Sequence, residues 1–94
     1  MLVKLLDQNI SVEFVDELSG AYGDFDGSLL RIRLIRGLQK DVFLTSFIHE
    51  LIHVKQHFFG HDMDEDHANQ DALFWYGVLK SSRLLQRLWK EYIE

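Results

Sequence analysis

The sequence predicts an α+β fold in which a small antiparallel sheet is followed by three helices. Residues 10–15 alternate apolar and polar side chains, as a half-buried strand does, and residues 30–34 repeat that pattern. Beyond residue 41 the apolar residues instead recur at helical spacing. Strands first and helices after is an order typical of α+β domains. Because the chain has 94 residues, no proline and no internal repeat, we expect a single domain over residues 1–94.

The predicted strands lie in the N-terminal third of the chain. Residues 1–9 are compatible with a helix or a strand, and we expect a short helix there. Ile10–Val15 is the first predicted strand, and the segments 19–24 and 26–27 after it carry turn-forming residues. In the second strand, apolar residues at 30, 32 and 34 alternate with Arg31 and Arg33, which predicts one buried face and one exposed basic face.

Helices are predicted for the rest of the chain. The first runs from Asp41, whose carboxylate can cap the free amides of the first turn, to about Phe59, with Gly60 at the C′ position. The second covers about 64–80 and is capped by the aspartate at 62 or at 64. The third begins at Ser81 or Ser82 and carries an apolar stripe of leucine and aromatic side chains.

Composition excludes several classes of protein. The chain has no cysteine, so disulfide bonds and thiolate ligands are excluded, and a metal ion would need nitrogen and oxygen donors. It contains no run of about twenty apolar residues, so we expect no membrane-spanning helix, and its N-terminus does not fit a secretory signal. We therefore expect a cytoplasmic protein. A net charge of −5 without a large basic cluster argues against nucleic acid as a partner.

The most informative segment, His49-Glu50-Leu51-Ile52-His53, lies in the first predicted helix. Positions i and i+4 share one helix face, so His49 and His53 can offer imidazole nitrogens to a single metal ion. Glu50 can lean over the same site and polarise a water molecule. This HExxH pattern is typical of zinc-dependent peptidases. Alternatively, the histidines are partly buried polar residues with hydrogen-bond partners, although the apolar flanks of this helix make polar side chains costly there.

A catalytic zinc ion usually takes three protein ligands. The next potential ligands along the chain are Glu65, His67, His61 and Asp66. Glu65 shares a helix face with two alanines, whose small size lets the second helix approach the first. His67 lies about 200° around the helix from Glu65, at ~100° per residue, so a regular helix cannot point both inward. We therefore predict His49, His53 and Glu65 as ligands, with His67 as the rival to Glu65.

Other polar residues have candidate supporting roles. Asn69 could hydrogen-bond the second ring nitrogen of a ligating histidine, as such sites normally require. Asp71 could do the same, but a surface carboxylate is the simpler interpretation. His57, four residues after His53, fits a solvated surface histidine. Tyr76 and His61 are candidates to stabilise an oxyanion, and nothing in the sequence decides between them.

With these two motifs the chain resembles the gluzincin group of zinc metallopeptidases, which carry HExxH on one helix and a glutamate ligand on the next. Glu65-Asp66-His67-Ala68-Asn69 matches the Glu-x-x-Ala-Asn/Asp form of the second motif. The stretch from the strand Leu30–Leu34 through HELIHVKQ is similar to the minimal single-domain members, the minigluzincins, and to small phage or bacterial proteins with an ImmA/IrrE-like core. The resemblance covers roughly residues 10–80.

This resemblance implies a minimal zincin-like domain that hydrolyses peptide bonds in a peptide or protein substrate. It implies His49, His53 and Glu65 as Zn²⁺ ligands and Glu50 as general base and acid. It also implies that the strand at about 29–35 lines the cleft and pairs with an extended peptide. Small members of the group can be latent, and the C-terminal helix is a candidate to occupy the cleft here. The spacing from His53 to Glu65 is shorter than in most members of the group, so little chain connects the two predicted helices.

Two other functions compete with this one. The first is a SprT-like zincin, in which His67 would be the third ligand and the protein would act near DNA. The acidic charge of the chain counts against it. The second is a non-catalytic, zinc-stabilised interaction protein, whose site would bind metal without turnover. The oligomeric state stays open.

Overall fold

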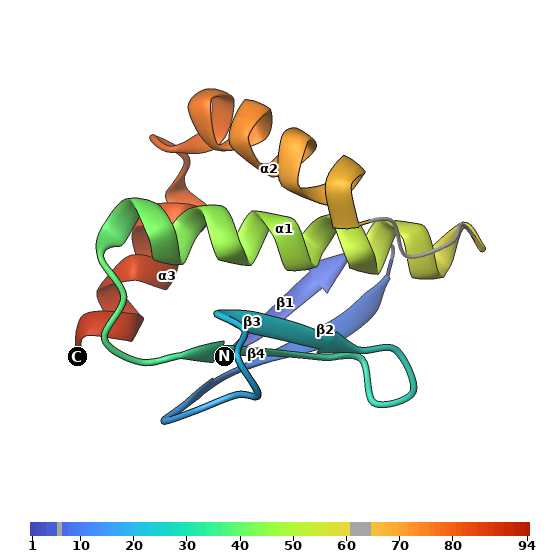
Figure 1. Ribbon diagram of the computed structural model, residues 1–94, viewed down its shortest axis with the longest axis horizontal. Helices are drawn as coiled ribbons and strands as arrows, with labels where there is room; N and C mark the ends of the chain where they lie inside the picture. Colours follow the sequence, from blue (N-terminus) through green and yellow to red (C-terminus); the bar gives the residue numbers. More distant parts are fainter. Residues whose placement is uncertain (6, 61–64) are drawn as a thin grey trace.

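The computed structural model describes residues 1–5, 7–60 and 65–94. Its elements, in chain order, are β1 (Leu2–Leu5), β2 (Gln8–Val15), β3 (Gly23–Asp26), β4 (Arg31–Ile35), α1 (Lys40–Phe58), α2 (Glu65–Leu79) and α3 (Arg83–Ile93). The strands form one four-stranded sheet, and α1 lies across it (Figure 1). On the side of α1 away from the sheet lies α2, so α1 is the middle layer (Figure 1). The fold is therefore α+β, as predicted.

The sheet is mixed rather than antiparallel. Its strand order is β1-β2-β4-β3, with antiparallel pairing at both ends and parallel pairing between β2 and β4. After β2 the chain passes to the edge of the sheet and forms β3. It then turns back, so that β4 lies between β2 and β3. The predicted antiparallel sheet is wrong at this central pair, because side-chain alternation does not report strand direction.

The N-terminal segment forms a strand, so the predicted short helix is wrong. In β1, Leu2 pairs with Ser11 and Leu5 pairs with Gln8. Asp7, with φ of 62°, lies in the tight turn between the two strands. Pairing with the predicted strand at 10–15 thus overrides a local sequence that is also compatible with a helix.

A further strand, β3, was not predicted, because its residues were interpreted as turns. The glycine and aspartates of β3 have low strand propensity, yet the segment pairs along its whole length with β4, from Gly23 opposite Leu34 to Asp26 opposite Arg31. Asp24 also binds Arg33 of β4, whose Nε lies 2.9 Å from Asp24 Oδ1. The basic face predicted for β4 is therefore partly neutralised by acidic residues of β3.

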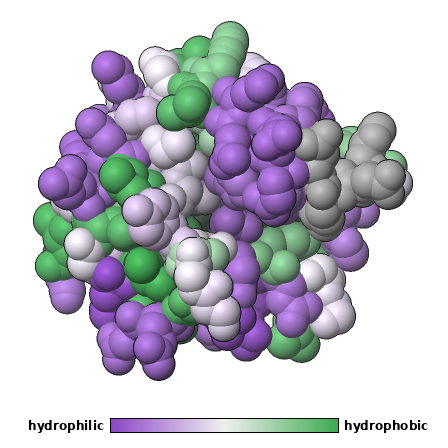
Figure 2. Space-filling model, in the orientation of Figure 1, coloured by the Kyte–Doolittle hydropathy of each residue, from purple (hydrophilic) through white to green (hydrophobic). Residues whose placement is uncertain are grey.

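The hydrophobic core lies between the sheet and α1 and extends to α3. It consists of sixteen buried residues: Val3, Ile10, Val12, Ile32, Leu34, Phe43, Leu44, Phe47, Ile48, Ile52, Val54, Ala68, Ala72, Leu85, Leu88 and Tyr92. The alternating positions of β2 and β4 point into this core, as predicted from their spacing. On the face shown in Figure 2, hydrophilic residues surround several separate hydrophobic patches.

The helix boundaries agree with the predictions except at the start of α1. Gln39 is the N-cap of α1 and makes no side-chain capping bond, so the prediction of Asp41 as the cap is wrong; Asp41 lies in the first turn. Gly60 has φ of 71°, which fits the C′ position. The predicted cap of α2 lies outside the described residues. Ser82 caps α3, its side chain accepting a bond from the backbone N–H of Leu85. No described helix has the length and hydropathy to cross a membrane.

Candidate metal centre

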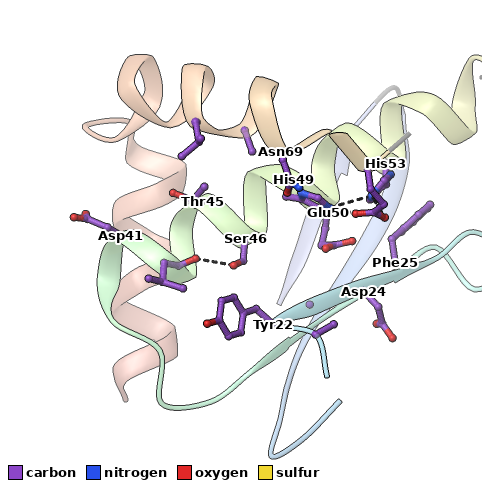
Figure 3. A pocket seen from close by; sticks show the side chains of 16 residues that line it. Tyr22, Asp24, Phe25, Asp41, Thr45, Ser46, His49, Glu50, His53 and Asn69 are labelled. Atoms are coloured by element: carbon purple, nitrogen blue, oxygen red, sulfur yellow. Dashed lines mark hydrogen bonds and ion pairs between the residues drawn. The ribbon is translucent and has the colours of Figure 1, made fainter. Parts of the chain in front are cut away.

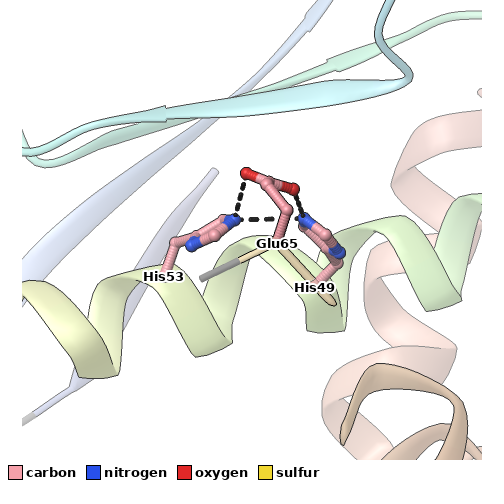
Figure 4. A group of neighbouring side chains, drawn as sticks. All are labelled: His49, His53 and Glu65. Atoms are coloured by element: carbon pink, nitrogen blue, oxygen red, sulfur yellow. Dashed lines mark hydrogen bonds and ion pairs between the residues drawn. The ribbon is translucent and has the colours of Figure 1, made fainter. Parts of the chain in front are cut away.

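His49 and His53 lie one turn apart on the face of α1 that is turned towards α2 and β3 (Figures 3 and 4). Their side chains are 15% and 7% exposed, and their Nε2 atoms are 3.1 Å apart. The i, i+4 spacing brings the two rings together, and the apolar residues on the other faces of α1 anchor the helix in the core. The two histidine side chains thus face the space between α1, α2 and β3.

Glu65 completes this group from the first residue of α2. One of its carboxylate oxygens lies 2.9 Å from His49 Nε2 and the other lies 2.8 Å from His53 Nε2 (Figure 4). Ala68 and Ala72 are the buried residues of α2, and their small side chains allow α2 to approach α1 closely. The structure therefore brings together the three side chains that the sequence predicts as ligands, His49, His53 and Glu65.

The donor atoms of this group fit a divalent cation such as zinc. Tetrahedral bonds of about 2.0–2.1 Å place neighbouring donor atoms roughly 3.3 Å apart. Here the two histidine Nε2 atoms are 3.1 Å apart, each lies 2.8–2.9 Å from a different oxygen of Glu65, and one donor atom from each residue can be chosen so that all three lie within 4.8 Å of one another. His53 Nδ1 donates a hydrogen bond of 2.8 Å to Oε1 of Gln56, which leaves the lone pair of His53 on Nε2, towards the group. Two imidazoles and a carboxylate are a donor set that zinc accepts in catalytic sites.

Glu50 is the ionisable residue with the most strongly raised pKa in the described chain. The residue is 5% exposed, and no hydrogen bond or ion pair to its carboxyl group is found among the described residues. Burial raises the pKa of Glu50 to about 8, with smaller contributions from the negative charges of Glu65 and Asp24. An ionisable group on so deeply buried a residue, with its carboxyl group at a pocket and a strongly raised pKa, is a candidate functional group.

A pocket of about 900 Å³ opens in front of these residues (Figure 3). It lies between α1, α2 and the segment containing β3, and it is lined by Ala21, Tyr22, Gly23, Asp24, Phe25, Asp41, Val42, Thr45, Ser46, His49, Glu50, His53, Glu65, Asn69, Ala72 and Leu73. Glu50 and both histidines face into it. The pocket is large enough for several residues of a peptide, and its walls combine apolar side chains with a few polar groups near the histidines.

The strand beside the pocket is β3, so the prediction that the strand at 29–35 pairs with a peptide is wrong. β4 is internal, since β2 and β3 occupy both of its edges. β3 has a free edge within the described part of the chain. The backbone N–H of Ile35 bonds to Tyr22 O, and alternation then directs the N–H and C=O groups of Gly23 and Phe25 away from β4. These groups are available to an extended chain in the pocket.

Gly23 allows β3 to lie close to Glu50. A Cβ atom at this position would be 2.8 Å from a methyl carbon of Leu34, 3.0 Å from the backbone oxygen of Arg33 and 3.4 Å from Cγ of Glu50. Any side chain would therefore displace the strand or its neighbours. The free edge of β3 and the carboxyl group of Glu50 are adjacent because residue 23 is a glycine.

The rival ligands are elsewhere or outside the described residues. His67 is exposed, and its Nε2 lies 3.1 Å from Asp71 Oδ2 on the outer side of α2. Asp66 is not part of the ligand group among the described residues, and His61 is not described. Asp71 pairs with His67 rather than with a ligating histidine, as its alternative interpretation as a surface carboxylate predicts.

The other predicted supporting residues have mixed outcomes. Asn69 lines the pocket, but Gln56 is the residue that bonds the second nitrogen of His53. The hydroxyl group of Tyr76 donates to Asp41 and does not line the pocket, so the structure does not support it as an oxyanion stabiliser. His57 is exposed and packs edge-on against Phe25, outside the pocket.

Two features of the site were missed and one expectation failed. Gln56 could have been found from its position, because it is a polar residue on the buried face of α1, three residues after His53. Gly23 and the edge strand had no comparable signal. No described residue of α3 lines the pocket, so the C-terminal helix does not occupy the cleft as the resemblance allowed.

Comparison with models of known families, with curated proteins and with solved structures finds no match for this chain.

Proposed function

We propose that this chain is a zinc-dependent peptide hydrolase of the HExxH type, with the gluzincin-like ligand set His49, His53 and Glu65. The observation that carries the proposal is the position of Glu50. Its buried, unpartnered carboxyl group lines the same pocket as three converging donor side chains. A structural metal site would need only the donors, whereas an acid–base group beside them is what hydrolysis requires.

The mechanism assigns Glu50 the proton transfers. Zinc held by the three ligands would act as a Lewis acid that polarises the substrate carbonyl and acidifies a water molecule. As the water oxygen bonds to the carbonyl carbon, Glu50 accepts the proton that the water loses. Glu50 then donates this proton to the amide nitrogen as the C–N bond breaks, so that an amine and a carboxylic acid are released, and the acid loses its remaining proton to the amine or to solvent. Burial raises the pKa of Glu50 to about 8 without metal; a bound cation nearby would lower this pKa and favour the carboxylate form that accepts a proton.

The free edge of β3 is the proposed substrate-binding element. An extended peptide can pair with the outward N–H and C=O groups of Gly23 and Phe25 as an additional strand. Gly23 lies beside Glu50, so this pairing directs the peptide past the catalytic carboxyl group. Backbone pairing does not select side chains, and we therefore expect broad recognition of extended segments in unfolded proteins.

The test compares metal content and hydrolysis in four single variants. We expect His53→Ala and Glu65→Gln to lose zinc, measured as moles of metal per mole of protein, and His67→Gln to retain it. We expect Glu50→Gln to retain zinc while hydrolysis of an unfolded protein falls about 10²–10⁴-fold. Equal hydrolysis by the wild type and Glu50→Gln would refute the catalytic role.

The alternatives predict other results from the same variants. If His67→Gln lost the metal and Glu65→Gln kept it, the SprT-like ligand set would be correct. A zinc-loaded wild type that hydrolyses none of a set of unfolded proteins and peptides would favour the non-catalytic, zinc-stabilised protein. The geometry disfavours the SprT-like alternative, because His67 points to the outer side of α2 and binds Asp71.

A further inference from the structure

The C-terminal half of α2 presents apolar side chains to solvent. Phe74, Trp75 and Val78 are 57%, 45% and 59% exposed, and we call these three residues the α2 ridge. The rings of Phe74 and Trp75 lie 5.2 Å apart and form one continuous aromatic surface. Exposed large apolar residues that gather on one element mark an interaction surface, whereas isolated ones are ordinary.

The ridge lies on the side of α2 away from α1. At about 100° per residue, Phe74 and Val78 are roughly 200–240° around the helix from the buried Ala72. No described element covers them, and a helix that is apolar on its outer face as well as its inner face is normally buried on both. The ridge therefore requires an occupant.

Gly77 indicates the shape of that occupant. A glycine within a helix costs about 0.5–1 kcal/mol relative to alanine. A Cβ atom at Gly77 would meet nothing within 4 Å, so no contact within the chain requires a glycine here. Gly77 follows Phe74 by three residues and precedes Val78, so it leaves a gap in the surface beside the ridge. A gap next to a large ring is a shape that can receive another ring.

The charges along α2 indicate that the occupant is a second copy of the same helix. Asp66 and Asp71 lie on α2 before the ridge, Lys80 directly follows the last residue of α2, and Arg83 is the first residue of α3. If two α2 helices run antiparallel about a two-fold axis near residues 75–76, Asp71 of each copy lies opposite Lys80 of the other. The same arrangement places Phe74 of one copy opposite Gly77 of the second copy, and the reverse. Shape and charge are thus self-complementary about one axis.

We propose that two copies of this chain associate through the α2 ridge, with the helices antiparallel and Phe74 of each copy packed on Gly77 of the other. A helix of 15 residues is about 22 Å long and roughly 10 Å wide, so one helix face offers each partner much less than the ~800 Å² of a standard interface. The dimer is therefore weak and forms as the protein concentration rises. The proposal does not depend on metal binding or on hydrolysis.

The first test is sedimentation equilibrium of the full chain over a series of concentrations. We expect the wild type to shift from monomer to dimer and Phe74→Glu to stay monomeric, with unchanged far-ultraviolet circular dichroism. Ile93→Glu is the matched control, since Ile93 is also a helical apolar residue, 60% exposed, but lies on α3; it should dimerise as the wild type does. A wild type that is monomeric throughout overturns the proposal and leaves the ridge to a different protein. Dimerisation of Phe74→Glu overturns it as well.

Gly77→Leu tests the specific packing. Because nothing in the same chain lies within 4 Å of a Cβ atom at this position, the monomer tolerates the side chain, and its thermal unfolding temperature should be no lower than that of the wild type. In the proposed dimer the leucine occupies the place of the second copy's aromatic ring, so dimerisation should be lost. A Gly77→Leu chain that folds and still dimerises like the wild type overturns the antiparallel arrangement.

Discussion

Glu50 is the residue at which stability and function conflict most clearly. Its carboxyl group lies in the pocket with 5% of the residue exposed, and its pKa is raised to about 8, mainly by burial. Most residues buried this deeply are apolar, and a glutamine would fill the same space without a charge. The chain retains an ionisable group whose charged form destabilises the metal-free fold.

The pH dependence of stability tests this conflict in the metal-free protein. The folded-state pKa of Glu50, about 8, lies above the unfolded value of 4.5. Between pH 4.5 and pH 8, Glu50 therefore keeps a proton in the folded chain that it has released in the unfolded chain. The contribution of Glu50 to stability is therefore fully present below pH 4.5 and is lost as the pH rises to 8. We expect Glu50→Gln and the wild type to be nearly equally stable near pH 4.5. At pH 9 the variant should be more stable by an amount on the order of 3–5 kcal/mol, measured by urea unfolding. A difference that does not change with pH would contradict the assignment.

Gly23 is the residue that sets the distance between the edge strand and Glu50. We expect Gly23→Ala to destabilise the protein by about 1–3 kcal/mol, because the added methyl group would overlap with Leu34 and with backbone. Hydrolysis should fall in the same variant, since β3 moves relative to Glu50. Gly77→Ala, in dilute solution, is the control. It adds the same atom where nothing lies within 4 Å and should stabilise the protein by about 0.5–1 kcal/mol. Equal stabilities of the two variants would contradict the close approach at Gly23.

At the scale of elements, one tyrosine of α3 fixes the connection from β4 to α1. The hydroxyl group of Tyr92 donates to the backbone oxygen of Ile35 and accepts a 2.7 Å bond from the backbone N–H of Leu38. The Tyr92 ring stacks on Phe43, with ring centroids 3.7 Å apart. α3 thus holds the segment that leads into α1, the helix that carries the two candidate histidine ligands.

Removal of this hydroxyl group should weaken the whole fold. Tyr92→Phe keeps the ring but leaves a backbone donor and a backbone acceptor without partners, which costs about 1–3 kcal/mol when the groups remain buried. We expect a lower midpoint of urea unfolding. Tyr22→Phe is the matched control, because Tyr22 is 58% exposed and should change the midpoint little. Equal midpoints for the two variants would show that the Tyr92 bonds contribute nothing.

The elements that the sequence predicted well are those with a local signal. The i, i+4 histidines, the apolar faces of α1 and α3 and the cap at Ser82 depend on residues within a few positions of one another. β1, β3 and the parallel pair were predicted wrongly or missed because they depend on pairing between distant segments. Gly23, for example, reads as a turn residue from its neighbours, and only the presence of β4 and Glu50 beside it explains the strand.

At the scale of the whole molecule, the candidate site also has parts that a local sequence pattern predicts and parts that depend on distant segments. His49, His53 and Glu65 were predicted from their spacing, and the structure places all three side chains together. The cleft could not be predicted, because its second wall comes from β3, which ends at Asp26, well before the helix that begins at Lys40 and carries the histidines. The strand edge that faces the cleft was therefore assigned to β4, which is internal, rather than to β3.

Zinc should stabilise the whole molecule if the three donors bind it. A ligand that binds only the folded state at 100 times its dissociation constant contributes about 2.7 kcal/mol. For a domain of this size, that corresponds to an increase of roughly 10–20 °C in the unfolding temperature. We expect this increase for the wild type on addition of zinc, measured by scanning calorimetry, and its reversal by a chelator. His67→Ala should respond like the wild type and His53→Ala should not respond. A similar increase for His53→Ala would place the binding site elsewhere.

The small side chains between α2 and α1 have a consequence for how the protein would behave if it binds zinc and the metal becomes scarce. Ala68 and Ala72 are the buried residues described in α2, so no large, fully buried apolar side chain of α2 holds this helix on α1. The cation would then be a cross-link between the two helices. Depletion of the metal should speed amide hydrogen exchange throughout α2 while the sheet, α1 and α3 keep their protection. One wall of the cleft would open along with the loss of the bound ion, and digestion by an added protease would begin in α2.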